Sequence, residues 1–338
     1  MLEKLYRDYN SYLRELFGCR VQKITIDAGL TCPNRDGTLA RGGCIYCNDK
    51  GSGTGAYARA SITDQVRFAK ERLARKYNAR KFLAYFQSYS NTYAPLEKLA
   101  PLYEQALADP DIVGLSIGTR PDCVPDDVLD HLESISRTRL VWMEYGLQSS
   151  NDKTLRLINR GHESAAFSDA LRRTRARHIP VCAHVILGLP GEDLEDMLAT
   201  ARFLADSKVE ALKIHLLYVV KQTRLHELYL SGEYRCLSRE EYARAAGQFL
   251  ALIPPEVIIQ RITGDPHRQE LAAPGWALEK QKNLEAVQAY MREKELYQGK
   301  HYRASDQKRR SFTGMARHRS EESKPCGPAG PGDSAGAR

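Results

Sequence analysis

The sequence has no stretch that resembles a membrane span or a secretion signal. No run approaches the ~20 consecutive apolar residues that cross a bilayer. The N-terminal segment 1–18 is charged and amphipathic and has no apolar signal core. These absences predict a cytoplasmic protein with no membrane partner. In a reducing compartment the eight cysteines are expected to be thiols, metal ligands or redox groups, not disulfides.

A second closely spaced pair of cysteines is also missing. Cys32, Cys44 and Cys47 follow the spacing C-x11-C-x2-C, and the other five cysteines are scattered. Zinc sites usually take four ligands, commonly from two such pairs. Three thiolates suit a four-iron cluster better, because they leave one iron open to another ligand. A zinc knuckle completed by a distant His or Asp is the alternative.

No internal repeat and no low-complexity linker precedes residue 303, so the earlier residues are expected to form a folded body. Strand-like apolar runs alternate along this body with helical patterns. The runs cover 21–28, 81–88, 112–118, 139–148, 179–189 and 209–220, and the helical patterns cover 3–17, 62–77, 96–108, 125–136, 151–158, 164–177, 192–206, 223–230 and 238–251. This order predicts parallel βαβ units. The predicted fold class is therefore α/β, with a partial (β/α)6 TIM-like barrel that falls short of eight units.

The domain prediction has three parts. Residues 1–252 form the partial barrel with its N-terminal helix, and 253–302 form a C-terminal α/β extension packed on the barrel. Within the extension, 257–262 is strand-like and 276–295 is helical. Residues 303–338 are predicted to be a disordered basic tail, because they are rich in Gly, Pro, Ser and Ala and hold eight Lys/Arg against four acids.

Positive charge is concentrated in that tail, which carries half of the net charge of +8. Two shorter basic runs, 67–81 and 171–178, lie in the body. Such runs are either solvated helix faces or, together with the tail, a surface for a polyanion such as RNA.

Polar segments follow the predicted strands directly. They are 87–93, 119–123, 148–152 and 189–193, and the cysteine loop follows the first strand. Chemistry in such folds takes place at the carboxyl ends of the strands. We therefore expect all of these segments to gather at one mouth of the barrel.

The loop CPNRDGT…GGCIYC resembles the cysteine loop of the radical S-adenosylmethionine (SAM) superfamily. Four further stretches resemble, in order and spacing, the branch that contains the Elongator catalytic subunit, and above all its YhcC/YtqA-type bacterial subgroup. They are GLSIGTRPD (114–122), EYGLQSSNDKTLRLINRGH (144–162), HVILGLPGE (184–192) and LKIHLLYVVKQTRLHELY (212–229).

The resemblance implies a radical SAM barrel with two cofactors. Cys32, Cys44 and Cys47 would hold a [4Fe–4S] cluster whose open iron binds SAM, and reductive cleavage of SAM would yield a 5′-deoxyadenosyl radical. An electron donor such as flavodoxin or ferredoxin is implied as a partner.

The resemblance also suggests residues that bind SAM. Many relatives carry Gly-Gly-Glu where this chain has 88–92, so Ser88 and Asn91 are candidates here. Gln148 and Arg160 have the spacing of a Gln and an Arg that reach SAM in coproporphyrinogen-type relatives; the alternative for Arg160 is a salt bridge at the barrel rim. His184 stands in place of a ribose-binding Asp, unless it is a core histidine. The remaining candidates for SAM binding are Ser116, Glu144 and Gly188.

Two further residues are candidates for catalysis. Cys123 follows a predicted strand and would donate a hydrogen atom or ligate an auxiliary metal, unless it packs as an ordinary thiol. Lys221 follows the sixth predicted strand and would face the substrate.

The implied function is modification of tRNA at carbon-5 of the wobble uridine. The subgroup points to conversion of a 5-carboxymethylaminomethyl side chain to 5-aminomethyl. Acetyl transfer is not expected, because little sequence follows the barrel. One alternative is a radical SAM enzyme for a small metabolite or peptide. Another is a non-enzymatic Fe–S or zinc protein that binds RNA. The sequence does not indicate an oligomeric state.

Removal of 303–338 is predicted to leave SAM cleavage intact, since this composition contributes no core. The measurement is formation of 5′-deoxyadenosine by the full chain and by the truncated chain under reductant. A fall in melting temperature on truncation would contradict the prediction, because it would mean that the tail packs on the body.

Overall fold

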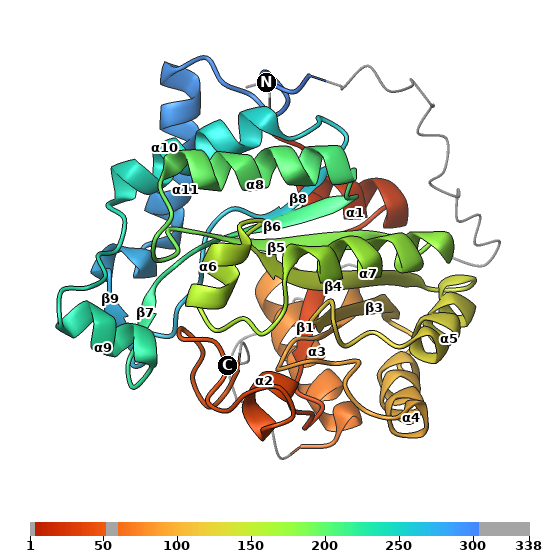
Figure 1. Cartoon of the computed structure of the whole chain (residues 1–338). Coiled ribbons are helices and arrows are strands. Elements are labelled where there is room, and N and C mark those ends of the chain that lie inside the picture. The colour runs from red at the N-terminus through yellow and green to blue at the C-terminus, as the bar shows by residue number, and fades with distance from the viewer. Residues whose placement is uncertain (1–3, 52–59, 304–338) are drawn as a thin grey trace, which may run out of the picture.

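A parallel sheet of seven strands forms the centre of the molecule (Figure 1). The computed structural model describes residues 4–51 and 60–303, so the predicted tail lies outside the described residues beyond Arg303. In sheet order the strands are β1 (Val21–Ile26), β2 (Lys81–Phe86), β3 (Ile112–Thr119), β4 (Leu140–Gln148), β5 (Val181–Leu187), β6 (Ala211–Leu216) and β8 (Ile258–Arg261). Every neighbouring pair is parallel. The predicted α/β partial barrel is confirmed.

Most of the helices connect the strands and cover the outer face of the curved sheet, whereas α1 (Tyr9–Phe17) packs at one end of its inner face (Figure 1). In chain order the helices are α1, α2 (Pro33–Asp36), α3 (Ile62–Tyr77), α4 (Leu96–Leu107), α5 (Asp126–Ser136), α6 (Asp152–Leu157), α7 (Ser164–Ala176), α8 (Leu194–Ser207), α9 (Arg224–Leu230), α10 (Arg239–Leu252) and α11 (Lys280–Glu293). A large apolar cluster fills the space between them and the sheet.

The seventh strand comes from the segment predicted as a C-terminal extension. Ile258 is buried on the inner face of the sheet and Ile259 on the outer face. A strand buried on both faces belongs inside a parallel sheet, and β8 pairs with β6. The sheet therefore has one strand more than the six predicted for the barrel. The rest of the extension supplies β9 (Leu271–Ala273), which pairs antiparallel with β7 (Val219–Val220) of the preceding segment, and α11, which packs on α10.

The sheet curves until side chains of its first and last strands meet. The Lys23 ammonium on β1 donates to Gln260 Oε1 on β8 at 2.8 Å. The amino-terminal end of the inner face is closed by α1, whose Tyr9 and Leu13 pack on an apolar layer that includes Trp142. The Trp142 ring meets Tyr9 edge-on, with 6.1 Å between ring centroids. The inner face is therefore closed at one end, and the carboxyl ends of the strands form the mouth.

Within the described residues, no helix combines the length and the apolar character needed to cross a membrane.

The α1 closure predicts unequal effects for two leucines of one helix. Leu13 is buried and Leu16 is exposed. We expect Leu13→Ala to lower the free energy of unfolding by about 3 kcal/mol, because it leaves a cavity in the core. The matched control Leu16→Ala is expected to change it by less than about 0.5 kcal/mol. Urea denaturation measures both, and equal effects would show that α1 does not close the barrel.

Candidate active site

The cysteine loop is fixed to the mouth by backbone hydrogen bonds. Cys32 caps α2, and the Cys47 N–H donates to the Cys44 carbonyl at 2.9 Å. The Ile45 N–H donates to the Ile158 carbonyl at 3.1 Å, and the Ile45 carbonyl accepts from the Leu225 N–H at 2.8 Å. These bonds tie the loop to the segment after α6 and to α9. The loop is therefore held by segments far away in the sequence.

Cationic and amide donors surround the thiols. Arg160 Nη1 and Asn34 Nδ2 each lie 3.7 Å from Cys44 Sγ, and Arg35 Nη1 lies 3.8 Å from Cys47 Sγ. Positive charge next to a thiol favours the thiolate, which is the form that binds metal. Burial acts in the opposite direction and, with the charges of Cys44 and Cys32 nearby, raises the pKa of Cys47 to about 12. A bound cation reverses this balance.

The donor set fits an iron–sulfur cluster by its chemistry. Cys32, Cys44 and Cys47 share one loop and influence one another electrostatically, and Arg160 and Arg35 would balance the charge of their thiolates. In the described part of the chain, no three His, Cys, Asp or Glu side chains are gathered closely enough to hold a metal ion. When bound, a cluster supplies the electron that cleaves SAM.

The structure brings Gln148 and Arg160 together over Gly146 at the end of β4. A methyl group added at Gly146 would lie 2.7 Å from both Gln148 Nε2 and Arg160 Nη2. Arg160 Nη2 donates to the Gly146 carbonyl at 2.6 Å, and Gln148 adopts a left-handed backbone with φ of 75°. Arg160 is buried and forms no ion pair with any described acid. The rim salt bridge is therefore not observed, and the SAM role of the pair stays a prediction.

Buried polar atoms without partners line the loop after β2. Ser88 Oγ, Ser90 Oγ and Asn91 Oδ1 are buried and form no hydrogen bond within the described residues, and the same holds for Arg160 Nε. The Ser90 N–H donates to the Thr31 carbonyl at 3.2 Å, which places this loop beside the cysteine loop. Buried polar groups are normally paired. The unpaired acceptors and the donor fit a polar ligand such as SAM, and Ser88 and Asn91 would contact it.

Two further SAM candidates differ in their surroundings, because Gly188 is covered by protein atoms and Ser116 Oγ is buried without a hydrogen-bond partner within the described residues. A methyl group at Gly188 would lie 3.0 Å from Leu237 Cδ1, and the Gly188 carbonyl accepts from Tyr234 Oη at 2.9 Å. Ser116 is buried on the inner face, beside Tyr9. The SAM-binding role of both residues stays a prediction, and protein atoms already cover Gly188.

Glu144 and His184 belong to a buried charge cluster on the inner face, which also contains Lys23 and Lys213. Glu144 accepts from Lys23 at 2.5 Å and from Lys213, and its other contact is His184 Nε2 at 2.9 Å. We call these four residues the inner-face cluster. Burial opposes ionisation of Glu144, but Lys213 and Lys23 hold its pKa well below the usual value. Its carboxylate is thus occupied by residues of the chain.

Sequence reasoning missed both lysines of this cluster. The signal was present, because VQKITI and ALKIHL each place one lysine in an apolar strand. Burial lowers the pKa of Lys213 to about 7 against the opposing effect of Glu144. Burial also lowers the pKa of His184 to about 4, so its imidazole is neutral near pH 7.

Cys123 and Lys221 lie in different surroundings. Cys123 is buried after β3 and lines a pocket of about 710 Å³ together with Tyr93, Lys98 and Asp122. Burial, with Asp122 beside it, raises the pKa of its thiol to about 12, so the thiol is protonated. Lys221 is exposed and donates to the Gln269 carbonyl at 3.1 Å. Neither residue joins the inner-face cluster.

A parallel half-barrel with three cysteines on a loop at its mouth defines an iron–sulfur enzyme that uses SAM. The radical SAM superfamily model matches residues 34–204, and the Radical_SAM C-terminal domain matches 209–293. The chain belongs to the radical SAM superfamily, whose members use a [4Fe–4S] cluster and SAM.

Three relatives are similar to the chain in sequence, and one solved structure is similar in fold. YtqA of Bacillus subtilis is 41% identical over 301 residues, which cover 89% of this chain and 94% of YtqA. YhcC of Escherichia coli K12 is 38% identical over 293 residues, covering 86% and 94%. Human Elongator complex protein 3 is 30% identical over 156 residues, covering 45% and 28%. The archaeal Methanocaldococcus infernus Elp3 has a similar fold, with a TM-score of 0.63 at 18% identity over 82% of this chain and 64% of that chain.

Loss of one loop thiol is predicted to abolish cluster assembly. Cys44→Ala leaves two thiolates, too few for a site-differentiated cluster, and the far-UV circular dichroism is expected to stay unchanged. The matched control is Cys236→Ala, which removes a half-buried thiol outside the loop. Iron and sulfide per chain after anaerobic reconstitution measure the effect. Full iron content in Cys44→Ala would contradict the assignment.

Because His184 is neutral in the folded protein, we expect the free energy of unfolding to fall in acid. Between pH 6.5 and pH 4 the unfolded chain binds a proton that the folded His184 does not bind, so stability falls as pH falls through this window. We expect His184 to contribute a loss of about 1–2 kcal/mol between pH 7 and pH 5. Urea denaturation at both pH values should show a smaller loss for His184→Gln. The exposed control His301→Gln should keep the full loss, and an identical loss in all three proteins would refute this account.

Proposed function

We propose that this radical SAM enzyme modifies tRNA in the cytoplasm, at the C5 side chain of the wobble uridine. The proposed reaction converts 5-carboxymethylaminomethyluridine to 5-aminomethyluridine. The observation that carries the proposal is the similarity to Elongator complex protein 3, together with the ordered motifs shared with that branch. Hydrogen abstraction suits this side chain, because it needs no acidic proton.

Residues at the two ends of the inner face would have different functions. Cys32, Cys44 and Cys47 would hold the cluster, and Ser88, Asn91, Gln148 and Arg160 would orient SAM beside it. The curved sheet and α1 exclude water from the base of the inner face. The inner-face cluster lies deeper and would face the substrate.

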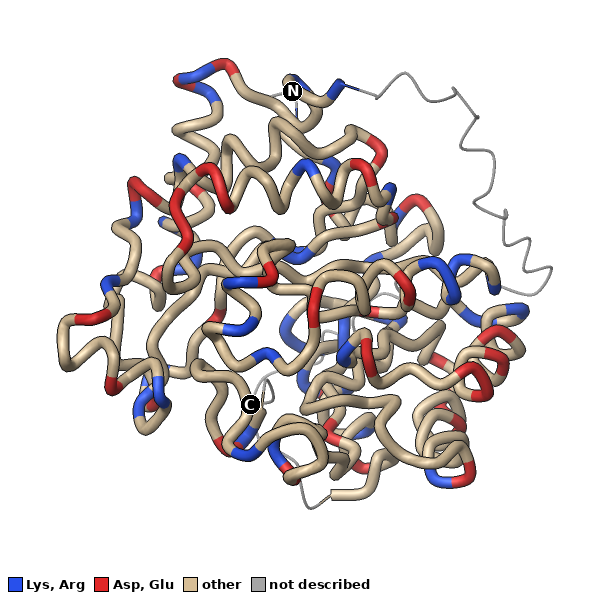
Figure 2. Tube along the Cα trace, in the orientation of Figure 1, with Lys and Arg blue, Asp and Glu red and all other residues tan. Residues whose placement is uncertain are grey.

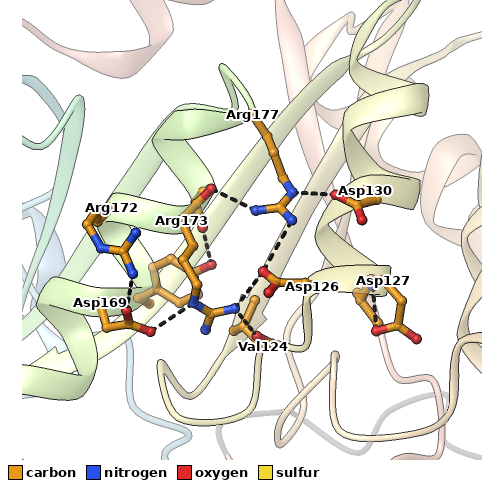
Figure 3. A network of polar contacts seen from close by, with 11 residues as sticks. Val124, Asp126, Asp127, Asp130, Asp169, Arg172, Arg173 and Arg177 are labelled. Carbon is orange, nitrogen blue, oxygen red and sulfur yellow. Dashed lines mark hydrogen bonds and ion pairs between the residues drawn. The ribbon is translucent and has the colours of Figure 1, made fainter.

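The outer surface offers less support for RNA binding than the sequence suggested. Figure 2 shows basic and acidic residues interspersed on the outer helices. In the run 171–178, Arg172, Arg173 and Arg177 form ion pairs with Asp169, Asp126 and Asp130 (Figure 3), and Arg175 pairs with Glu210 at 2.9 Å. These pairs join α7 to α5 and α7 to the start of β6. This basic run therefore has a structural explanation.

This surface favours a second candidate function, a radical SAM enzyme for a small metabolite or peptide. Such a substrate needs no extended basic surface. The salt dependence of tRNA binding distinguishes the two, because phosphate contacts weaken steeply as salt rises. Absence of salt-dependent binding by the reconstituted enzyme would favour the small substrate.

The tRNA proposal predicts a defined change in cells. Deletion of the gene is expected to abolish 5-aminomethyluridine and its derivatives in tRNA and to accumulate 5-carboxymethylaminomethyluridine. Nucleoside analysis of bulk tRNA by mass spectrometry measures both. The wild-type gene should restore the profile, Cys236→Ala should also restore it, and Cys44→Ala should not. An unchanged profile in the deletion strain would refute the tRNA substrate.

A further inference from the structure

The inner face of the half-barrel carries more positive than negative charge. Its charged side chains are Lys23, Lys213 and Arg261 against the single carboxylate of Glu144. Both lysines pair with that carboxylate. Arg261 is a half-buried residue, and its guanidinium forms no hydrogen bond, ion pair or ring contact with any of the residues that the structure describes. Its nitrogens are not among the buried, unpartnered ones, so this cation is accessible to an anionic ligand.

An irregularity in strand pairing turns Arg261 toward the inner face. Ala211 pairs with Ile258 and Leu212 with Ile259, but Lys213 pairs with Arg261, so Gln260 is an extra residue in β8. Because of such a bulge, a side chain lies on the opposite face from the one that strict alternation along the strand would give it. In agreement, the charge of Arg261 acts on four inner-face groups, Tyr85, Cys182, Lys213 and His215.

Two acids that act on the same tyrosine as Arg261 are already paired. Asp265 and Glu270 lie close to Tyr218, and the charge of Arg261 also affects the pKa of this tyrosine. Asp265 accepts from Lys280 at 2.9 Å, and Glu270 pairs with Lys50 and accepts from Asn48 at 3.0 Å. The chain itself therefore supplies no described carboxylate for Arg261.

Next to Arg261 lies a second donor without an acceptor. Gln260 Oε1 accepts from Lys23 at 2.8 Å. Its Nε2 is buried and has no partner within the described residues. A guanidinium and an adjacent amide that both lack acceptors form a site that matches a planar anion with two oxygens.

We propose that Arg261 and Gln260 bind a carboxylate of the substrate on the inner face. The inference rests on the proposed function, because the 5-carboxymethylaminomethyl side chain ends in a carboxylate that the 5-aminomethyl product lacks. The site would therefore distinguish substrate from product. Lys23 and Lys213 position the site through Glu144, since Lys23 binds both that carboxylate and Gln260.

SAM also has a carboxylate, but it is expected elsewhere. Arg160, the predicted SAM ligand, contacts Cys44 and Gly146 at the end of β4. Arg261 lies on β8, three strands farther along the sheet, or about 14 Å at the usual strand spacing.

The test measures binding of a nucleoside to the anaerobically reconstituted enzyme with SAM present. The probes are 5-carboxymethylaminomethyluridine and its methyl ester, which lacks the negative charge. Wild type is expected to bind the acid at least about tenfold more tightly, as for other charged hydrogen bonds. Arg261→Met should reduce the preference to less than about twofold, and Arg261→Lys should retain part of it because charge remains without the planar fork. The exposed Arg268→Met is the matched control and should keep the wild-type preference.

Several outcomes would overturn the carboxylate site. They are equal binding of acid and ester by wild type, or an undiminished preference in a folded Arg261→Met variant with wild-type melting temperature. Weaker binding of SAM to Arg261→Met would also overturn it, because the carboxylate would then be that of SAM; the expected change in SAM affinity is below about twofold.

The nucleoside assay and the tRNA profile can fail separately. A carboxylate preference that depends on Arg261, together with an unchanged tRNA profile in the deletion strain, would support the carboxylate site and refute the tRNA substrate. An altered tRNA profile without any carboxylate preference would support the tRNA substrate and refute the carboxylate site.

Discussion

The ionised Glu144 inside the half-barrel is the interaction on which the inner face depends. Its carboxylate joins Lys23 on β1, Lys213 on β6 and His184 on β5 to its own strand β4. A buried charge costs several kcal/mol unless partners compensate it, so none of these side chains could be buried there alone. Well-packed apolar residues would often stabilise such a position better. The cluster instead keeps the inner face polar.

The polar layer lies between two differently built ends. Below it, Leu13 and Trp142 form a dry apolar closure. Above it, Arg160 connects the end of β4 to the cysteine loop through the Gly146 carbonyl and Cys44 Sγ. One buried guanidinium thereby sets the height of the loop relative to the sheet. Because parallel strands all point their carboxyl ends at the same edge, the cofactor loop and the substrate-facing layer share one opening.

Much of this arrangement follows from local sequence. The spacing of apolar residues predicted a helix at 62–77, where the structure has α3. The spacing of the cysteines predicted the metal-binding loop. The membership of β8 in the main sheet was not predicted, because a strand of four residues gains its place only through pairing with β6. The role of Lys213 was missed for a related reason. It depends on an ion pair with Glu144, which is 69 residues away in the sequence. Gly188 was predicted to bind SAM, and local sequence did not reveal that Leu237 from a later loop lies against it.

The arginines on the outer surface and the arginine on the inner face differ in their ion pairing. On the outer surface, Arg173 and Arg177 are neutralised by carboxylates that connect helices, and exposed pairs of this kind add little stability. On the inner face, Arg261 has no described partner, so its charge is available to an anionic ligand. Charge recognition in this enzyme is therefore better sought inside the half-barrel than on its basic helices.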